Sequence, residues 1–239
     1  MNNLFLFWEG SKFLLIEKLK DLIFQHSKEY NVHFINYSNL DSYLDYIPEG
    51  FKNLNLAFQA DYVRVNVIKQ YGGIWVDVDT LFMNSPKKLF DILEEKTGFF
   101  VIADNKRISN GVFGSKKETA LLDNWNDHNI RVIENAVSTK RQIVWGHLGF
   151  IFLNYVYNNS RNLLDDYSLL DGLSTIYPIP WENACNIYLS DVDYSTIQRE
   201  FQPVIILVNS VYRAVEQNPD ILNHSLLGKL IKMSEDNLL

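Results

Sequence analysis

The chain has 239 residues, and its 22 Lys and Arg against 29 Asp and Glu give a formal net charge of −7. Hydrophobic residues make up 47 % and charged residues 21 %, which is the balance of a globular protein and excludes a disordered chain. The acidic balance argues against a nucleic-acid binder, because neutralising phosphates needs a dense face of Lys and Arg. Cys185 is the single cysteine, so the composition excludes an internal disulfide framework and a cysteine-rich zinc site, and it favours a reducing compartment.

The length suits one domain at roughly 100–200 residues per domain, and no repeat or Pro/Gly/Ser-rich linker divides the chain. We therefore predict a single domain over residues 1–239. No apolar run approaches the roughly 18 residues of a membrane-spanning helix. The N-terminal segment has no basic region, and its apolar run is too short for a signal peptide. These features predict a cytoplasmic protein.

The first half of the chain alternates predicted strands and helices. Short apolar runs predict strands, and apolar residues at helical spacing predict amphipathic helices. Gly72 and Gly73 follow the second helix, where glycine allows the chain to turn with positive φ. The order strand, helix, strand is the opening of an α/β domain. The strands are expected at Leu4–Trp8, Val32–Tyr37 and Ile74–Val78, and the helices at about Ser11–Tyr30 and Phe51–Tyr71.

The second half continues this pattern less regularly. The two prolines between Tyr177 and Trp181 predict an irregular loop, because proline fixes φ and has no backbone donor. The sequence thus predicts the α/β class, with a mixed sheet flanked by helices. Strands are expected at Gly98–Ala103, Gly111–Gly114 and Pro203–Val208, and helices near Lys116–Asn126, Leu148–Tyr157 and Asp220–Met233.

Two carboxylates follow the third predicted strand. Asp77 and Asp79 are two residues apart, so an extended backbone would send both side chains to the same side. Carboxylates at a strand end can hold a hard divalent cation such as Mn²⁺ or Mg²⁺ and leave coordination positions for phosphate oxygens. Such a cation would neutralise a diphosphate leaving group. Taken alone, an Asp-x-Asp pair more often marks an acidic, solvated turn.

An acid–base pair lies on the helix before that strand. Asp61 interrupts an apolar stripe, and a buried carboxylate needs a partner. Arg64 lies three residues later, on the adjoining face one turn on. The pair suits either a structural ion pair or side chains that reach the crevice at the C-terminal ends of the strands, where ligands of α/β folds collect.

The ordered set of Asp61, Arg64, Gly72-Gly73 and Asp77-x-Asp79 resembles the sugar-binding DXD glycosyltransferases. That group includes capsular polysaccharide synthesis transferases, yeast-type α-1,6-mannosyltransferases and, more distantly, the large glucosylating bacterial toxins. The match is tight over about Leu56–Pro86 and looser elsewhere. It contains several elements in the right order and at the right spacing.

The resemblance implies a GT-A-type single domain with a Rossmann-like mixed sheet. About residues 1–115 would bind the nucleotide sugar, and about residues 116–239 would lie on the acceptor side. The compact length and the segment Leu207–Tyr212 look most like a bacterial capsule or surface-polysaccharide transferase. The implied reaction retains the anomeric configuration and moves a hexose or N-acetylhexosamine from a nucleotide sugar, with UDP preferred over GDP. The implied acceptor is an oligosaccharide or a lipid-linked glycan at the cytoplasmic face, with at most peripheral membrane contact.

The resemblance also implies roles for single residues. Asp79 matches the principal metal ligand, and Asp77 matches the acid nearer the ribose and donor sugar. Asp61 and Arg64 match the pair that contacts donor hydroxyls and the ribose or phosphate region. Stabilising the departing diphosphate is then the main catalytic contribution of Asp77, Asp79 and Arg64.

Four further positions have competing interpretations. Trp8 matches a first-strand tryptophan that stacks on the nucleobase, and its alternative is core packing. Asn110 matches a polar residue beside the donor sugar, or it is an ordinary turn residue. His147 is a candidate for a phosphate or hydroxyl contact at a helix N-terminus, or it is a structural histidine. The loop Tyr177–Trp181 suits an aromatic platform for an acceptor sugar or core packing.

The sequence departs from the family near its C-terminal end. Many relatives complete the metal or diphosphate site with a histidine at the end of a C-terminal strand, whereas here Pro203–Val208 runs into Asn209. The amide oxygen of Asn209 could replace that ligand, since it suits a hard cation. His224 and water are the alternative third ligands.

Two other functions stay open from the sequence. Asp77-Val78-Asp79-Thr80 also resembles the haloacid-dehalogenase-type phosphatases, in which the first Asp is a nucleophile and the second a general acid/base. That motif usually lies near the start of a chain, and the phosphatase interpretation leaves Asp61 and Arg64 unexplained. The second alternative is a catalytically silent nucleotide-sugar or glycan binder on the same fold.

Overall fold

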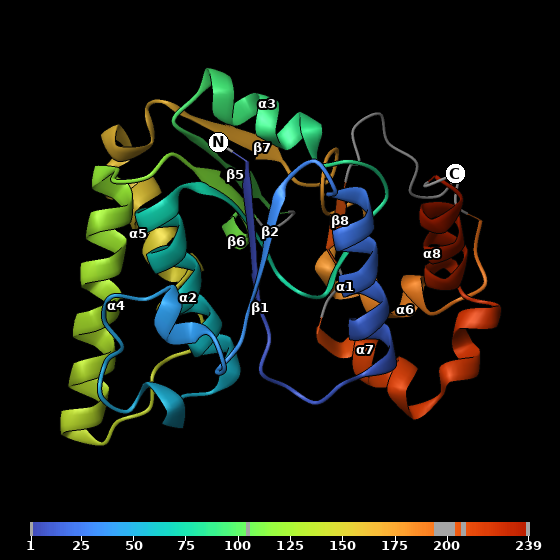
Figure 1. Cartoon of the computed structure of the whole chain (residues 1–239), viewed down its shortest axis with the longest axis horizontal. Coiled ribbons are helices and arrows are strands. Elements are labelled where there is room, and N and C mark those ends of the chain that lie inside the picture. Colours follow the sequence, from blue (N-terminus) through green and yellow to red (C-terminus); the bar gives the residue numbers. More distant parts are fainter. Residues whose placement is uncertain (1, 104–105, 194–203, 207–208, 238–239) are drawn as a thin grey trace.

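The computed structural model describes residues 2–103, 106–193, 204–206 and 209–237 (Figure 1). A six-stranded sheet runs through it in the order β2-β1-β3-β6-β5-β7. The first three of these pair in parallel, β6 is antiparallel to both of its neighbours, and β5 pairs in parallel with β7. The strands are β1 (Asn3–Phe7), β2 (Asn31–Ile35), β3 (Gly73–Val76), β5 (Gly98–Ile102), β6 (Ile108–Ser115) and β7 (Tyr167–Asp171).

A second sheet of two strands joins distant parts of the chain. β4 (Thr80–Phe82) pairs antiparallel with β8 (Val204–Ile206), and Thr80 lies opposite Ile206. Thr80 directly follows Asp79. The pairing therefore brings the C-terminal strand to the part of the chain that carries the predicted metal ligands.

Helices cover both faces of the six-stranded sheet (Figure 1). On one face, α2, α4 and α5 pack over a core that includes Phe5 and Trp75. On the other face, α1, α3, α6, α7 and α8 enclose a core that includes Leu4 and Ile74. Neighbouring residues of one strand enter different cores, because successive side chains of a strand point to opposite faces. The helices are α1 (Leu14–His26), α2 (Leu56–Tyr71), α3 (Lys87–Glu95), α4 (Ala120–Thr139), α5 (Phe150–Asn159), α6 (Trp181–Tyr188), α7 (Asn209–Gln217) and α8 (Leu226–Asp236).

The predicted α/β class and mixed sheet are confirmed, but several element boundaries differ. The helix expected from Phe51 begins at Leu56, because Asn55 caps it by accepting a hydrogen bond from Ala57 N at 3.0 Å. Residues Phe51–Asn53 form a separate 3-10 turn. No helix in the described part of the chain combines the length and the apolar character that crossing a membrane requires.

The turn after α2 has the predicted backbone. Gly72 has φ 64° and Gly73 has φ 127°, a region that favours glycine. A Cβ on Gly73 would also lie 2.3 Å from Asn3 O, so the absence of a side chain lets β3 pack against β1. These glycines allow the chain to pass directly from α2 into the central strand.

The parallel pairing of β1 and β3 determines where the candidate site lies. Phe5 lies opposite Trp75, so Trp8 and Asp77, which follow the two strands, leave the sheet at the same edge. β6 starts at this edge because it runs antiparallel to β3, and Asp77 N donates to Gly111 O at 2.8 Å. Ligands of open α/β sheets bind at such C-terminal strand ends.

Candidate active site

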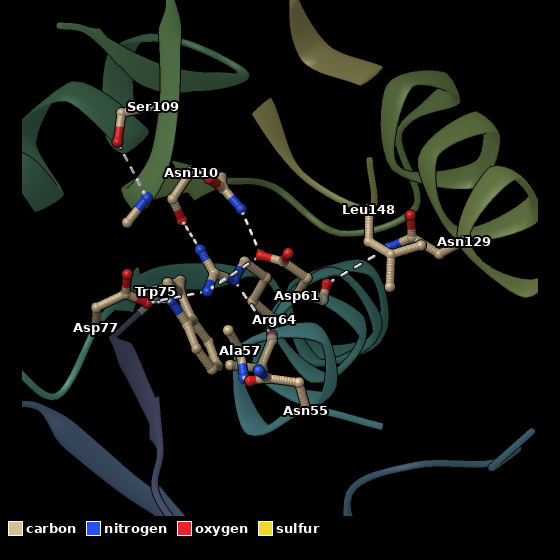
Figure 2. A network of polar contacts seen from close by, with 12 residues as sticks. Asn55, Ala57, Asp61, Arg64, Trp75, Asp77, Ser109, Asn110, Asn129 and Leu148 are labelled. Carbon is tan, nitrogen blue, oxygen red and sulfur yellow. Dashed lines mark hydrogen bonds and ion pairs between the residues drawn. The ribbon is translucent and has the colours of Figure 1, made fainter. Parts of the chain in front are cut away.

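A buried acid–base cluster lies at this edge of the sheet (Figure 2). Asp61 and Arg64 belong to α2 and are 8 % and 5 % exposed. Arg64 Nη2 lies 3.3 Å from Asp61 Oδ1 and 3.1 Å from Asp77 Oδ1. Arg64 is therefore the partner that the buried carboxylate of Asp61 requires, as expected for a structural ion pair. The pair extends to Asp77, which the sequence analysis assigned to donor binding.

Backbone oxygens and an aromatic ring fix the guanidinium of Arg64. Nε donates to Ala60 O at 3.2 Å, and Nη1 donates to Asn110 O. The Trp75 ring centroid lies 5.2 Å from Arg64 Cζ, a cation–π distance. Trp75 Nε1 also donates to Asp77 Oδ1 at 2.8 Å. Both Arg64 and Trp75 thus hold the same oxygen of Asp77.

Asn110 closes the cluster from β6. Its Nδ2 donates to Asp61 Oδ1 at 2.7 Å, and its backbone oxygen accepts from Arg64. Asn110 lies inside a strand, so its interpretation as an ordinary turn residue is wrong. The structure brings Asp61, Arg64, Asp77 and Asn110, four of the predicted donor-binding residues, into one network (Figure 2).

Asp79 lies in a turn and not on the predicted strand. β3 ends at Val76, and residues Val78 and Asp79 turn the chain into β4. The extended backbone predicted for Asp77–Asp79 is therefore wrong. The two carboxyl groups still interact, since Asp77 raises the pKa of Asp79 after the larger effect of burial.

The cluster gathers three carboxyl groups around one guanidinium. Burial raises the pKa of Asp61 to about 6, although Arg64 opposes this shift. Burial and the charge of Asp77 raise the pKa of Asp79 to about 8. Burial also raises the pKa of Asp77, against Arg64 and the Trp75 hydrogen bond. A divalent cation would favour the ionised form of these carboxyl groups, so the donor set fits a hard cation.

The described residues supply only part of a metal site. Among them, no group of three His, Cys, Asp or Glu could hold a metal ion. Asp77 and Asp79 therefore fit a cation whose remaining ligands are phosphate oxygens, water or an amide. The backbone of Asn209 begins α7, three residues after Ile206, but its side chain lies outside the described residues.

His224, the alternative third ligand, lies in a different part of the molecule. It follows the short 3-10 helix Pro219–Asn223 and is exposed. Lys229 and, more weakly, His224 lower the pKa of Asp191, which places His224 near Asp191. Among the described residues, no metal-binding group contains His224, and His224 has no effect on the pKa of Asp77.

The hydroxyl of Tyr177 lies against the cluster, a position that the sequence analysis missed. It is hydrogen-bonded to Ser109 Oγ, which accepts from Gly111 N at 3.2 Å. A Cβ on Gly111 would lie 3.0 Å from Asp77 Oδ2 and 3.2 Å from Tyr177 Oη. The absence of a side chain at Gly111 thus lets Asp77 and Tyr177 approach the same place. Trp181, the other ring of the proposed acceptor platform, is 69 % exposed at the start of α6.

Trp8 follows β1 at the same edge and is half-buried. Its Nε1 donates to Ser11 O at 3.1 Å. Its ring makes edge contacts with Phe13 and Tyr212, at centroid distances of 6.3 and 6.0 Å. Part of the indole packs against these rings and part stays accessible, so the core packing is confirmed and the stacking on a nucleobase stays a prediction.

His147 packs against α4. Its ring lies 5.2 Å from the ring of His128 on α4, and the two line a groove between α4 and α5. Gly149, two residues later, is the part of this segment that contacts the cluster, since a Cβ there would lie 2.3 Å from Asn110 Nδ2. The structure therefore does not bring His147 into the network of Asp61 and Arg64.

Comparisons with known proteins agree with this architecture. The profile of a family described as capsular polysaccharide synthesis protein matches residues 13–209, which is more than half of the chain. No curated protein matches the sequence.

Two solved glycosyltransferases have a similar fold. The galactosyltransferase LgtC, in complex with donor and acceptor sugar analogs, is 12 % identical with a TM-score of 0.51, over 98 % of this chain and 95 % of that one. Mouse xyloside xylosyltransferase 1, in its apo form, is 12 % identical with a TM-score of 0.50, over 88 % and 98 % of the two chains. At such identity the likeness establishes the fold alone, which is the predicted GT-A type.

Proposed function

Because this chain belongs to the capsular polysaccharide synthesis protein family and has a GT-A fold, we propose that it is a retaining, metal-dependent glycosyltransferase. It moves a hexose or N-acetylhexosamine from a nucleotide sugar, with UDP preferred, to an oligosaccharide or lipid-linked acceptor at the cytoplasmic face of the membrane. The observation that carries the proposal is the network in which Arg64 joins Asp61 and Asp77 at the C-terminal edge of the sheet. Ligands of α/β folds bind at this edge.

Asp77 and Asp79 are the residues that would hold the divalent cation, Mn²⁺ or Mg²⁺, with Asn209 as the proposed further ligand. When bound, such a cation supplies positive charge that neutralises the diphosphate leaving group. Arg64 and Trp75 both contact Asp77 Oδ1, so they orient the carboxylate with Oδ2 left for another partner. Arg64 is thus a positioning residue for Asp77.

The other side of the cluster suits the donor sugar. Asp61 Oδ1 is taken by Asn110 and Arg64, so we assign Asp61 Oδ2 to a donor hydroxyl. Trp8, at the end of β1, suits stacking on the base of the nucleotide. In a front-face reaction the bond from the sugar C1 to the phosphate oxygen breaks as the bond to the acceptor oxygen forms. The leaving diphosphate then takes the proton of the acceptor hydroxyl, and no base of the protein is needed.

Calorimetric titration with UDP- and GDP-sugars tests this proposal directly. Each donor is added to the protein with Mn²⁺ and, separately, with a chelator. We expect one donor to bind only with the metal and to lose that binding in Asp79→Asn and Asp77→Asn. Asp21→Asn, the same chemical change at an exposed position of α1, should bind the donor normally. Proton NMR of the product then reports whether the anomeric configuration is retained.

Three results would contradict parts of the proposal. Donor binding that is equally strong with the chelator would contradict the metal requirement. Donor binding with no transfer to any glycan acceptor favours the silent binder. No binding to any donor overturns the transferase, and an assay for phosphatase activity then tests the haloacid-dehalogenase alternative, which the GT-A fold disfavours.

A further inference from the structure

A groove of about 420 Å³ lies between α4 and α5, beside the cluster but outside it. Asn124, His128 and Arg131 of α4 line one wall, and Phe152 and Tyr155 of α5 line the other. The three polar residues are four and three positions apart, so they lie on one face of the helix. The groove therefore has a hydrogen-bonding wall opposite an aromatic wall.

The polar wall of the groove is basic in an acidic protein. Arg131 forms no ion pair within the described part of the chain, and none of the described residues that line the groove is Asp or Glu. Burial lowers the pKa of His128, so the permanent positive charge of the wall is that of Arg131. An unpaired guanidinium in such a place suits a carboxylate or a phosphate, which it can bind with two parallel hydrogen bonds.

His128 is fixed within the polar wall by two contacts, whereas Arg131 is exposed. His128 Nε2 lies 3.0 Å from His147 O, and the His128 ring lies 4.8 Å from the ring of Phe152. The opposite wall presents Tyr155, which is 61 % exposed and so offers an aromatic face with a polar tip. Charge on one side and an accessible ring on the other are the features that would bind an acidic sugar.

The groove shares a wall with the cluster. His147 lines the groove, whereas Gly149 packs against Asn110, which bonds to Asp61. Trp125 Nε1 of α4 donates to Leu148 O at 2.6 Å. This bond fixes the segment His147–Gly149, which lies between the groove and the cluster. Figure 2 shows Leu148 on the side of the network where Asp61 lies. A ligand in the groove is therefore separated from the cluster by one short segment of chain.

We propose that the groove between α4 and α5 binds an anionic segment of the acceptor glycan, a sugar that carries a carboxylate or a phosphate. The role of this sugar as part of an acceptor rests on the proposed transferase function, whereas the binding of an anionic sugar rests on the groove alone. Arg131 binds the anion with its guanidinium, and the ring of Tyr155 packs against the face of the sugar ring. The site would hold the growing glycan while its end reaches the donor.

Binding measurements with defined probes test the groove. The probes are a hexasaccharide of alternating glucuronate and N-acetylglucosamine, a neutral glucose hexasaccharide, glucose 1-phosphate and inorganic phosphate. We expect the glucuronate hexasaccharide or glucose 1-phosphate to bind, and the preferred one identifies the anion. Arg131→Ala should weaken that binding by about 10- to 100-fold, the effect of one charge-assisted hydrogen-bonding group.

Two further variants separate the groove from the fold and from net charge. Tyr155→Ala should also weaken binding, and its exposed side chain makes the variant safe for folding. Lys232→Ala removes the same charge as Arg131→Ala from an exposed position on α8, at the other end of the molecule, and should bind like the wild type. Asp79→Asn should lose donor binding and keep glycan binding, whereas Arg131→Ala should do the reverse.

The inference is overturned if no probe binds, if the neutral hexasaccharide binds as tightly as the anionic probes, or if Arg131→Ala changes nothing. Inorganic phosphate that binds as tightly as glucose 1-phosphate also overturns it, because the sugar then contributes nothing. If the protein binds an anionic probe but no nucleotide sugar, the groove proposal is supported and the transferase proposal is contradicted. The two proposals therefore fail separately.

Discussion

Arg64 is placed so that its loss should affect folding and donor binding by different routes. Its guanidinium contacts two carboxylates, Asp61 and Asp77, of which Asp61 is almost fully buried. Removing one partner of a buried pair typically costs about 3–5 kcal/mol, because the other charge is left without compensation. Neutralising Asp61 at the same time should recover much of that loss.

We therefore predict that Arg64→Ala lowers the free energy of unfolding by about 3–5 kcal/mol, and that Asp61→Asn in the same chain restores part of it. Urea denaturation of the two single variants and the double variant measures this coupling. Donor affinity should stay weak in the double variant, because Asp77 still lacks Arg64 and the carboxylate assigned to a donor hydroxyl is neutralised. Additive effects on stability would contradict the buried pair, and a double variant with normal donor affinity would make Arg64 purely structural.

Single residues of the cluster differ in how far the sequence could reveal them. Asp61, Arg64 and Asp77 lie close together in the chain, and a charged pair inside an apolar helix stripe signals a partner. Tyr177 and Ser109 are 68 residues apart, and no local pattern connects two hydroxyls over that separation. Their contact follows from the path of β6 and the loop after β7, so it needed the structure.

Among the elements, the long apolar runs were predictable and the short or polar ones were not. β4 has three residues and gains its place from pairing with β8, not from its own sequence. β7 and the helices α3, α6 and α7 were also missed. α3 and α7 are short and amphipathic, and polar or charged residues make up more than half of each, so tertiary packing decides their structure more than local preference does. β3 was predicted to end at Val78 but ends at Val76, because Val78 and Asp79 turn the chain into β4.

The segment before α5 makes a prediction at the scale of an element. Gly149 caps α5 and packs on Asn110, and a Cβ at Gly149 would lie 2.3 Å from Asn110 Nδ2. Gly149→Ala should therefore displace Asn110 from Asp61 and weaken donor binding about tenfold, the effect of about 1.4 kcal/mol. Calorimetric titration with the donor measures it.

The control for this prediction is a double-mutant cycle. Asn110→Ala removes the amide with which the new Cβ clashes, so Gly149→Ala should cost much less donor affinity in that background. Equal costs in both backgrounds would mean that Gly149 acts through its own backbone and not through Asn110.

A buried histidine that ties three elements gives a pH dependence. His26 Nε2 of α1 lies 3.1 Å from Ser234 O and 2.9 Å from Ser234 Oγ on α8, and Ser234 Oγ donates to Phe82 O of β4. Burial lowers the pKa of His26, although the backbone hydrogen bond opposes the shift. At this position the unfolded chain therefore binds a proton more readily, so His26 contributes a loss of stability as the pH drops below its unfolded value of about 6.5. The raised pKa values of Asp61 and Asp79 act in the opposite direction.

His26→Gln should remove this contribution, because glutamine can keep a bond to Ser234 but does not titrate. As the pH drops, the variant should therefore lose less stability, or gain more, than the wild type. Melting temperatures from about pH 7.5 to about pH 5.5 test it. The exposed position His224 serves as the matched control, and His224→Gln should keep the slope of the wild type. If the melting temperatures of His26→Gln and the wild type change in parallel with pH, His26 does not contribute to the pH dependence of stability.

At the scale of the whole molecule, elements that pack on the two opposite cores of the sheet position the site. Asp61 and Arg64 come from α2, which packs on one core, whereas β4, which follows Asp79, contributes Leu81 and Phe82 to the other core. A donor that binds between these parts should stabilise the complete folded chain, because the unfolded chain does not assemble them. Ligand binding should therefore appear as a change in global stability.

We predict that UDP with Mn²⁺ raises the melting temperature and that UDP with a chelator does not. At a ligand concentration of about 100 times Kd, linkage gives about 2.7 kcal/mol of stabilisation. In a chain of this size that corresponds to roughly 5–10 °C, at about 2–4 °C per kcal/mol. Differential scanning calorimetry measures the shift, and Asp79→Asn should abolish it while Asp21→Asn keeps it. A shift of the same size in Asp79→Asn would mean that nucleotide binding does not use the Asp77–Asp79 turn, and the proposed metal site would then have to be abandoned even if UDP binds.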